Sequence, residues 1–237
     1  MNKDIFKLSS ISFFCPAYND ALNLPELIPN VSKFLEKHTS LYEIVIIEDG
    51  SPDKTGEVAD TLSRQFPHVR VIHHEKNRGY SATLKEGFEK ASYDYVMYTD
   101  GDNQYNVFDF EPYLQLLEQN DVIAGYAVTK AVSSFRRFQS FVHNFLISIL
   151  FLTHFKDINC SMKIFKKKVL QEIEIKSNPS GAFIDAELIL KARQKGFKIR
   201  QFPVVHYARR NGIASGSKPS LILNTVKDMV KFRLGLL

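Results

Sequence analysis

Two aspartates separated by one glycine, Asp100-Gly101-Asp102, are the residues of this chain whose types and spacing best fit chemistry. They come directly after an apolar, β-prone run from Tyr95 to Tyr98, which predicts a buried strand. Gly101 lets the backbone turn tightly enough for both carboxylates to converge on one point. Two carboxylates so near to each other repel, and a hard divalent cation, which prefers oxygen ligands, relieves the repulsion. We therefore predict a divalent metal site here, the alternative being a surface turn, in which Asp-Gly pairs are common.

The elements that must position this pair alternate between strand and helix. Strands are predicted at 11–15, 43–47, 69–73 and 95–98, with helices at about 22–38, 53–66 and 81–91 between them. This alternation predicts an α/β fold with a mostly parallel central sheet and helices on both faces. All four strands end in polar or charged loops, and the carboxyl ends of parallel strands share the edge where open α/β sheets bind ligands.

The pattern is less regular after Gln104. It predicts a helix at 109–119, strands at 121–125, 157–165 and 198–205, a long amphipathic segment at 133–155, a helix at 184–195 and an amphipathic C-terminal helix at 219–237. No Gly-x-Gly-x-x-Gly follows the first strand, and the chain has no Gly-Lys-Ser/Thr loop. Dinucleotide-binding and P-loop interpretations are therefore disfavoured. The length is most simply that of one domain.

Composition limits the choice of partner. The net charge of +5 and pI near 9.0 favour nucleotides, phosphorylated lipids or an acidic membrane surface. No nucleic acid partner is expected, because the basic residues form no dense run interleaved with aromatics except at 163–168. Two distant cysteines, Cys15 and Cys160, fit a reducing compartment better than a disulfide framework. With neither a signal peptide nor a long uncharged apolar stretch in the sequence, we expect a cytoplasmic protein, peripheral on the cytoplasmic membrane face if it touches a membrane.

The order of several motifs resembles that of a known family. The motifs are Pro16-Ala17-Tyr18-Asn19, Glu48-Asp49-Gly50-Ser51, Asn77-Arg78-Gly79 and Asp100-Gly101-Asp102. In this order the chain resembles the family 2 glycosyltransferases of GT-A fold, and within them the dolichol-phosphate mannosyltransferase-like, or polyprenyl-phosphate glycosyltransferase, branch. Further matches are Arg136-Arg137, 157–163, 181–188 and 206–212. The resemblance covers about 10–222 and implies one Rossmann-like GT-A domain over 1–237, with a nucleotide-binding part at about 10–104 and an acceptor-side part at about 105–237.

The resemblance implies a metal-dependent, inverting transfer of a sugar from a UDP- or GDP-linked donor to a polyprenyl or dolichyl phosphate. It places Asp100 near the ribose or the metal, Asp102 as the principal metal ligand and Gln104 as a further ligand. Mg²⁺ or Mn²⁺ suits such oxygen ligands. The residues that it places around the donor nucleotide are Pro16, Ala17, Tyr18, Asn19, Asp49, Ser51, Arg78 and Asp100.

Two departures from the family pattern bear on the site. Glu48 stands where the family usually has aspartate, which keeps an acceptor for the base or ribose. The segment 126–130 replaces the common Gly-x-Arg, so an arginine that contacts phosphate is either missing or replaced by Lys130.

The acceptor decides which residues carry the catalysis. A lipid phosphate is already ionised near neutral pH and needs cations, for which the candidates are Arg136, Arg137, Arg209 and Arg210. A hydroxyl of a glycan or glycolipid needs a base instead. Asp185 matches the general base of hydroxyl-transferring relatives. The favourable interaction of a carboxylate with the dipole at a helix N-terminus explains an aspartate at this position equally well. An alternative of another class is a non-catalytic nucleotide-binding scaffold, which the intact Asp100-Gly101-Asp102 disfavours.

Membrane contact is a separate hypothesis. The segments 145–155 and 221–237 are amphipathic, and Lys227, Lys231 and Arg233 lie beside apolar residues in the second. This composition suits helices that lie in a membrane interface, while ordinary core or dimer-facing helices are the alternative. Direct peripheral contact and a membrane-anchored partner both agree with it.

Overall fold

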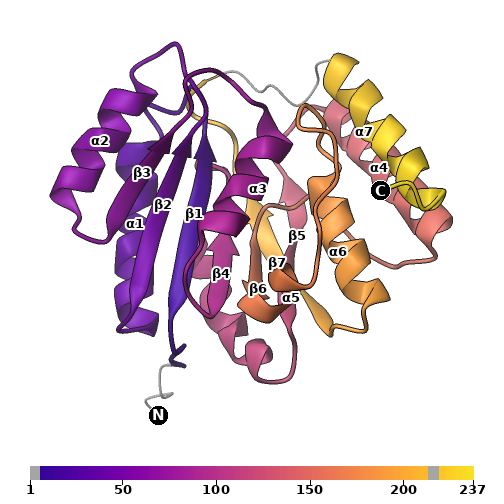
Figure 1. The fold of residues 1–237 in the computed structure, drawn as a ribbon, viewed down its shortest axis with the longest axis horizontal. Helices are drawn as coiled ribbons and strands as arrows, with labels where there is room; N and C mark the ends of the chain where they lie inside the picture. The colour runs from indigo at the N-terminus through magenta and orange to yellow at the C-terminus, as the bar shows by residue number, and fades with distance from the viewer. Residues whose placement is uncertain (1–5, 213–218) are drawn as a thin grey trace.

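The computed structural model describes residues 6–212 and 219–237, and within these it does not describe the side chains of 135, 136 and 219. In the described part, seven strands form one sheet in the order β3-β2-β1-β4-β6-β5-β7 (Figure 1). The strands are β1 (Ile11–Ala17), β2 (Tyr42–Glu48), β3 (Val69–His73), β4 (Tyr95–Tyr98), β5 (Val122–Lys130), β6 (Lys163–Lys166) and β7 (Ile199–His206). Every pairing is parallel except the two that β6 makes, with β4 and with β5. The predicted α/β fold with a mostly parallel sheet is confirmed.

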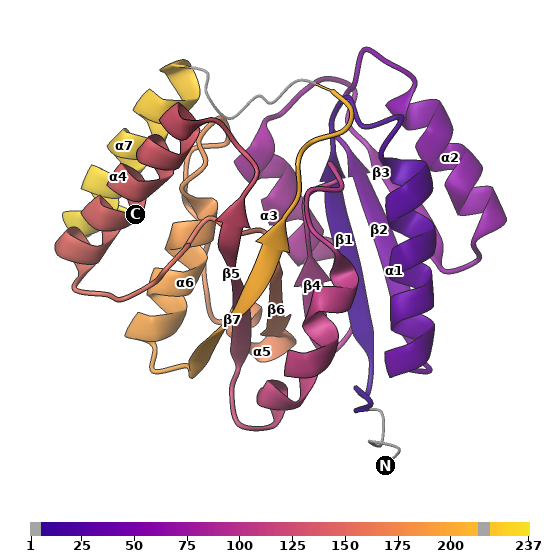
Figure 2. The ribbon, with the colours of Figure 1, turned by 180° about the vertical axis from the view of Figure 1, so that it is seen from behind.

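The helices cover both faces of the sheet, as the alternation predicts (Figures 1 and 2). They are α1 (Leu24–His38), α2 (Thr55–Gln65), α3 (Tyr80–Lys90), the 3₁₀ helix η1 (Val107–Glu118), α4 (Ser134–Phe151), α5 (Lys167–Gln171), α6 (Ile184–Gln194) and α7 (Pro219–Arg233). Apolar residues of α1, α2 and η1 share one core with one face of the sheet, and those of α3, α4, α5, α6 and α7 share the other. Strands enclosed on both faces need near-continuous apolar runs, which is what β1 and β2 have.

The acceptor-side half departs from prediction in two places. The expected strand over 157–165 is wrong for most of its length, because strand structure begins at Lys163. Residues 157–162 instead form an irregular connection that supplies Asp157 and Asn159 to a cavity. The helix expected at 109–119 is the 3₁₀ helix η1.

No helix within the described residues is long and apolar enough to cross a membrane. The helices α4 and α7 lie side by side at the edge of the molecule beyond α6 (Figures 1 and 2). Phe151 and Phe232 join them, with ring centroids 5.4 Å apart and an edge-to-face geometry.

Candidate functional site

Backbone hydrogen bonds join the end of β1 to the segments that follow β2 and β4 at one edge of the sheet. The amide of Gly101 donates to the carbonyl of Pro16 (3.2 Å), and the amide of Asp49 donates to the carbonyl of Ala17 (3.0 Å). A Cβ atom at position 101 would lie 2.7 Å from the Pro16 carbonyl oxygen, which only glycine avoids. Three of the four motifs, which begin at Pro16, Glu48 and Asp100 and are far apart in the sequence, therefore lie side by side in the fold.

A cavity of about 220 Å³ opens at this edge. Its lining residues are Asp100, Asp102, Gln104, Tyr105, Lys130, Val132, Ser140, Asp157, Asn159 and His206. They come from the end of β4, the end of β5, α4, the connection before β6 and the end of β7. Three of these side chains are carboxylates and one is a lysine, so the cavity suits a cation and the polar part of a ligand that binds through it.

Asp102 is buried, with 9% of its surface exposed, and both of its oxygens have hydrogen-bond partners. Oδ1 accepts a bond from the amide of Gln104 (3.1 Å), and Oδ2 accepts one from the guanidinium of Arg209. Gln104 is fixed in turn by two hydrogen bonds to Tyr207. Its side-chain Nε2 donates to the backbone carbonyl of Tyr207 (3.0 Å), and its backbone carbonyl accepts from the backbone amide of Tyr207 (2.8 Å). The loop after β7 is thus held against the aspartate pair.

Asp100 is half-buried and lies beside the hydroxyl groups of a tyrosine and a serine. Its Oδ1 accepts a hydrogen bond from the hydroxyl of Tyr80 (3.1 Å), and its amide donates to Ser161 Oγ (3.3 Å). Burial, together with the negative charges of Asp102 and Asp185, raises the pKa of the Asp100 carboxyl to about 7. A cation beside the pair would favour the ionised form of both carboxylates.

The donor set fits a divalent ion. Asp100, Asp102 and the amide of Gln104 supply the oxygen chemistry that Mg²⁺ and Mn²⁺ prefer. His206 lines the same cavity, and its buried Nδ1 has no hydrogen-bond partner among the described residues. Burial lowers the pKa of His206, which favours the neutral imidazole. Because the described part of the chain holds no group of three or more His, Cys, Asp and Glu side chains suited to a metal, further ligands would come from amide, substrate or water oxygens.

Six of the eight residues expected around the nucleotide lie at the ends of β1 and β2, while Arg78 follows β3 and Asp100 follows β4. Tyr18 leaves 37% of its surface exposed, and Asn19 has a left-handed backbone with φ of 60°. The amide of Asn19 donates to Ser51 Oγ (3.2 Å), which brings the first and second motifs together. An exposed tyrosine ring beside this loop offers a stacking face for a base.

Asp49 is buried and serves the neighbouring loop. Its carboxylate accepts bonds from His74 Nδ1 (2.6 Å), the amide of Arg78 (2.8 Å) and the amide of Gly79 (3.0 Å). The guanidinium of Arg78 points elsewhere, to Glu86 on α3 (2.7 Å), and its side chain is half exposed. Asp49 therefore fixes the loop 76–79 in this structure, while Arg78 forms a surface ion pair.

The candidate cations divide into two groups. Arg209 contacts Asp102, and Lys130 lines the cavity, where it pairs with Asp157 (2.8 Å). Arg210 lies farther out, 3.3 Å from Glu26, and Arg137 is exposed beside Ser134. Arg136 lies on α4, but its side chain is outside the described part of the chain.

Asp185 is not on the cavity wall. It is 2% exposed, and its Oδ1 accepts bonds from Lys163 Nζ (2.6 Å) and from the hydroxyl of Tyr98. Its Oδ2 lies 3.4 Å from the hydroxyl of Tyr80. Both oxygens thus contact other residues of the chain.

Sequence reasoning assigned no role to Tyr80, Asp157, Lys163 or His206. Asp157 and Lys163 belong to a motif that matched the family, but the spacing did not show what they contact. A lysine among Met162, Ile164 and Phe165, all buried, was the available signal of an internal charge.

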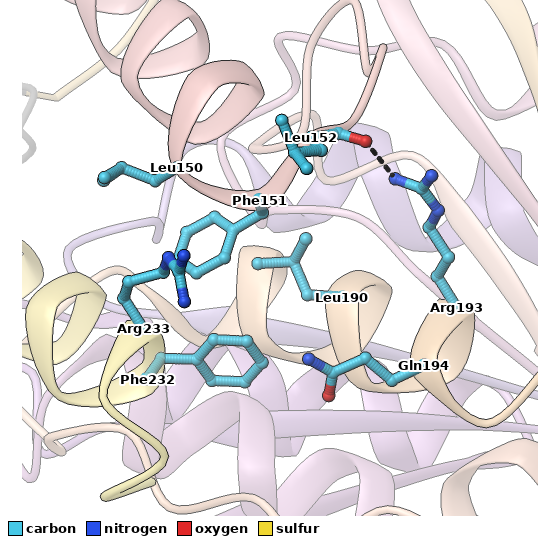
Figure 3. Close-up of a pocket in the computed structure, with 8 residues that line it drawn as sticks. All are labelled: Leu150, Phe151, Leu152, Leu190, Arg193, Gln194, Phe232 and Arg233. Carbon is cyan, nitrogen blue, oxygen red and sulfur yellow. Dashed lines mark hydrogen bonds between the residues drawn. The ribbon is translucent and has the colours of Figure 1, made fainter.

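A second hollow, of about 390 Å³, lies between the C-terminal ends of α4, α6 and α7 (Figure 3). Leu150, Phe151, Leu190 and Phe232 give it an apolar lining. Figure 3 shows the guanidinium groups of Arg193 and Arg233 on opposite sides of the hollow, with Arg193 bonded to the carbonyl of Leu152 (3.0 Å). None of the eight lining residues is a carboxylate, so this hollow is distinct from the aspartate site.

The fold agrees with the comparisons to known proteins. The model of the family "Glycosyl transferase family 2" matches residues 12–174. The chain belongs to this family, and it is a glycosyltransferase of GT-A fold. Its relatives fit the polyprenyl-phosphate glycosyltransferase branch, which confirms the resemblance seen in the motifs.

Two relatives are dolichyl-phosphate beta-glucosyltransferases. The one from Trichomonas vaginalis, ALG5A, is 27% identical over 94% of this chain and 73% of its own length. The one from Dictyostelium discoideum is 25% identical over 98% of this chain and 76% of its own length. A similar solved structure is glucosyl-3-phosphoglycerate synthase from Mycobacterium tuberculosis in complex with Mn²⁺ and UDP-glucose, with a TM-score of 0.73 and 19% identity over 97% of this chain and 80% of that one. At that identity the likeness supports the fold alone.

Proposed function

We propose that this glycosyltransferase moves a sugar from a UDP- or GDP-linked donor to a polyprenyl or dolichyl phosphate, with inversion and with the help of Mg²⁺ or Mn²⁺. The observation that carries the proposal is one cavity lined by Asp100, Asp102 and Lys130, with a second cation, Arg209, against the Asp102 carboxylate. The names of the two dolichyl-phosphate beta-glucosyltransferase relatives support the acceptor class.

The proposed chemistry is a single displacement. An oxygen of the acceptor phosphate forms a bond to the anomeric carbon while the bond from that carbon to the donor diphosphate breaks. The electron pair leaves with the nucleoside diphosphate, and attack from the opposite side inverts the carbon. A divalent ion held by Asp102, Asp100 and Gln104 would stabilise the negative charge that develops on the diphosphate.

The residues of the chain have separate tasks in this scheme. Tyr18, Asn19 and Ser51 hold the nucleoside, and Asp49 fixes the loop that follows β3. Arg209 and Lys130 attract the phosphates, since guanidinium and ammonium groups form strong charge-assisted hydrogen bonds to phosphate oxygens. Arg136, Arg137 and Arg78 are assigned to the approach of the anionic ligands rather than to the reacting atoms.

The rival acceptor, a glycan or glycolipid hydroxyl, requires Asp185 as the base that takes its proton. Asp185 is buried and already contacts Lys163, Tyr98 and Tyr80. A proton acceptor in that position would have to leave these partners in each turnover. Since a phosphate oxygen needs no base, the burial of Asp185 favours the phosphate.

We also propose that the protein binds to anionic membranes through the α4–α7 apolar surface. We define this surface by its exposed apolar residues, which are Phe138, Phe141, Phe145, Leu146, Ile149 and Leu152 on and beside α4 and Ile222, Leu223, Val226, Val230, Leu234 and Leu236 on and beside α7. Lys227, Lys231 and Arg233 are exposed on the same α7, where they would meet acidic headgroups. A large exposed apolar area rimmed by cations is typical of an interaction site.

Two measurements test the proposed reaction. Calorimetric titration with UDP and with GDP, each with and without Mn²⁺, is expected to show metal-dependent binding of one nucleotide. Transfer of labelled sugar from that nucleotide is then measured to a polyprenyl phosphate and to the matched polyprenol, and product is expected with the phosphate alone. Product with a hydroxyl acceptor would overturn the acceptor assignment, and binding without any transfer would favour the scaffold.

A further inference from the structure

Lys163 is the most deeply buried charged side chain near the site, with none of its surface exposed. It lies at the start of β6, opposite Tyr98 of β4 in the antiparallel pairing. Its ammonium contacts Asp185 Oδ1 (2.6 Å), the hydroxyl of Tyr98 (3.1 Å) and the carbonyl of Cys160. An ammonium has three protons, so these three acceptors satisfy it completely.

Asp185 is held from two sides by this arrangement. It lies in the first turn of α6, where the partial positive charge of a helix N-terminus stabilises a carboxylate. Lys163 supplies the full countercharge at 2.6 Å. A buried ion pair with this many partners has one geometry, because any other leaves a charge without a hydrogen bond.

Tyr80 connects this pair to the aspartate site. Its hydroxyl lies 3.1 Å from Asp100 Oδ1 and 3.4 Å from Asp185 Oδ2. The hydroxyl has one proton, and the shorter distance directs it to Asp100. Asp185 Oδ2 is the second acceptor within reach of the same proton, so its position affects where the Tyr80 hydroxyl lies, and that hydroxyl orients the Asp100 carboxylate.

We propose that Lys163 is a positioning residue of the donor site, which acts through Asp185 and Tyr80 on the orientation of Asp100. The proposal rests on the proposed function in one respect, namely that Asp100 faces a divalent ion. In this proposal Asp185 helps to position a metal ligand and does not act as a base for the acceptor. Lys163 touches neither substrate nor metal in this scheme.

Metal binding without any acceptor tests the proposal directly, since a base for the acceptor has no effect on it. Mn²⁺ binding is measured by electron paramagnetic resonance with Mn²⁺ alone and with Mn²⁺ plus UDP or GDP. Tyr80→Phe removes one hydroxyl and is expected to weaken Mn²⁺ binding three- to tenfold. Tyr95→Phe, at the other end of β4, is the matched control and is expected to bind as the parent does.

Substitution of the ion pair extends the test. Asp185→Asn keeps the shape of the side chain and is expected to weaken Mn²⁺ binding at least as much as Tyr80→Phe. Lys163→Met leaves the buried Asp185 carboxylate without its countercharge and can therefore misfold. The double variant Lys163→Met/Asp185→Leu, which has no buried charge here, is measured beside it to separate misfolding from a changed orientation of Asp100. The double variant is expected to unfold in one cooperative transition, as the parent does, and to bind Mn²⁺ as weakly as Tyr80→Phe.

The outcomes distinguish this proposal from the proposed function. Parent-like Mn²⁺ binding by Tyr80→Phe and Asp185→Asn would overturn the positioning role, and loss of turnover in the same Asp185→Asn protein would return Asp185 to the role of base. A parent that binds neither Mn²⁺ nor a nucleotide would overturn the proposed function and the positioning role together.

Discussion

The guanidinium of Arg209 donates a hydrogen bond to Oδ2 of Asp102, a residue 107 positions earlier in the chain. The chain's own cation therefore lies against the carboxylate that we assign as the principal metal ligand. A divalent ion and Arg209 would compete for this oxygen, and release of Arg209 would free its guanidinium for a phosphate. We therefore expect Arg209, in the loop after β7, to change partners when the donor site is filled.

Arg209→Ala should have opposite effects on metal binding and on turnover. Without its competitor, Mn²⁺ should bind the nucleotide-free protein about fivefold more tightly, the equivalent of about 1 kcal/mol for a half-buried charge pair. Turnover should fall because a phosphate loses its cation. Arg200→Ala, an exposed residue of β7, is the control. Mn²⁺ binding by Arg209→Ala that is equal to the parent's would refute the competition.

Asp102→Ala should abolish metal-dependent nucleotide binding and lower turnover at least a hundredfold, because electrostatic stabilisation of a leaving diphosphate is a large part of such catalysis. Asp60→Ala, at an exposed carboxylate on α2 that pairs with His73, controls for the loss of one negative charge. Calorimetry and a transfer assay on the same preparations provide the measurement. Turnover that survives in Asp102→Ala would remove the metal role from this residue.

The contact of α3 with β1 predicts different responses from two helical glycines. A Cβ at Gly87 would lie 2.2 Å from the ring of Phe14, while one at Gly56 in α2 would meet its nearest atom at 3.5 Å. Gly87→Ala should destabilise the fold by about 1–3 kcal/mol through overpacking, despite the better helix propensity of alanine. Gly56→Ala should be neutral or slightly stabilising. Thermal or urea unfolding of both variants checks the difference, which would vanish if Phe14 moved freely.

Glu43 predicts a pH dependence of stability. Burial raises the pKa of its carboxyl, but hydrogen bonds from Ser12, the Ser92 amide and Arg70 together hold it below its usual range. Because the folded state binds the proton less tightly than the unfolded chain, this stabilisation is present above the ordinary carboxyl pKa of 4.5 and is lost as the pH falls through the lowered value.

Glu43→Gln should therefore cost about 1 kcal/mol near neutral pH, and the difference from the parent should shrink as the pH falls below that range. Urea unfolding of both proteins at several pH values is the measurement. A difference that stays constant with pH would show that the charge of Glu43 contributes nothing.

The α4–α7 apolar surface predicts binding to anionic vesicles. Phe141 and Phe145 are 64% and 53% exposed. Changing both to serine should lower vesicle affinity roughly tenfold or more, since each ring would lose its burial in the membrane interface. Leu22→Ser, at a residue 73% exposed in the loop between β1 and α1, is the control. Co-sedimentation at low and high salt is the measurement, and unchanged binding would favour a membrane-anchored partner.

The sequence by itself determined the alternation of strands and helices, the polar ends of β1, β2, β3 and β4 and the aspartate pair. Each of these depends on local periodicity or on the backbone freedom of a neighbouring glycine, and both can be read within a few residues. The acceptor-side half was less predictable because its sheet order does not follow the chain. β6 enters between β4 and β5 in the opposite direction, and its pairing partners are far from it in the sequence.

Only the tertiary structure decided which charges meet. Asp102 contacts Arg209, Asp157 pairs with Lys130, and Asp185 pairs with Lys163 inside the protein. These partners come from different strand ends and loops, and their pairing is set by the low dielectric of the interior, where an isolated charge is costly. For the same reason Asp185, which in sequence resembles a general base, lies buried against a lysine in the folded chain.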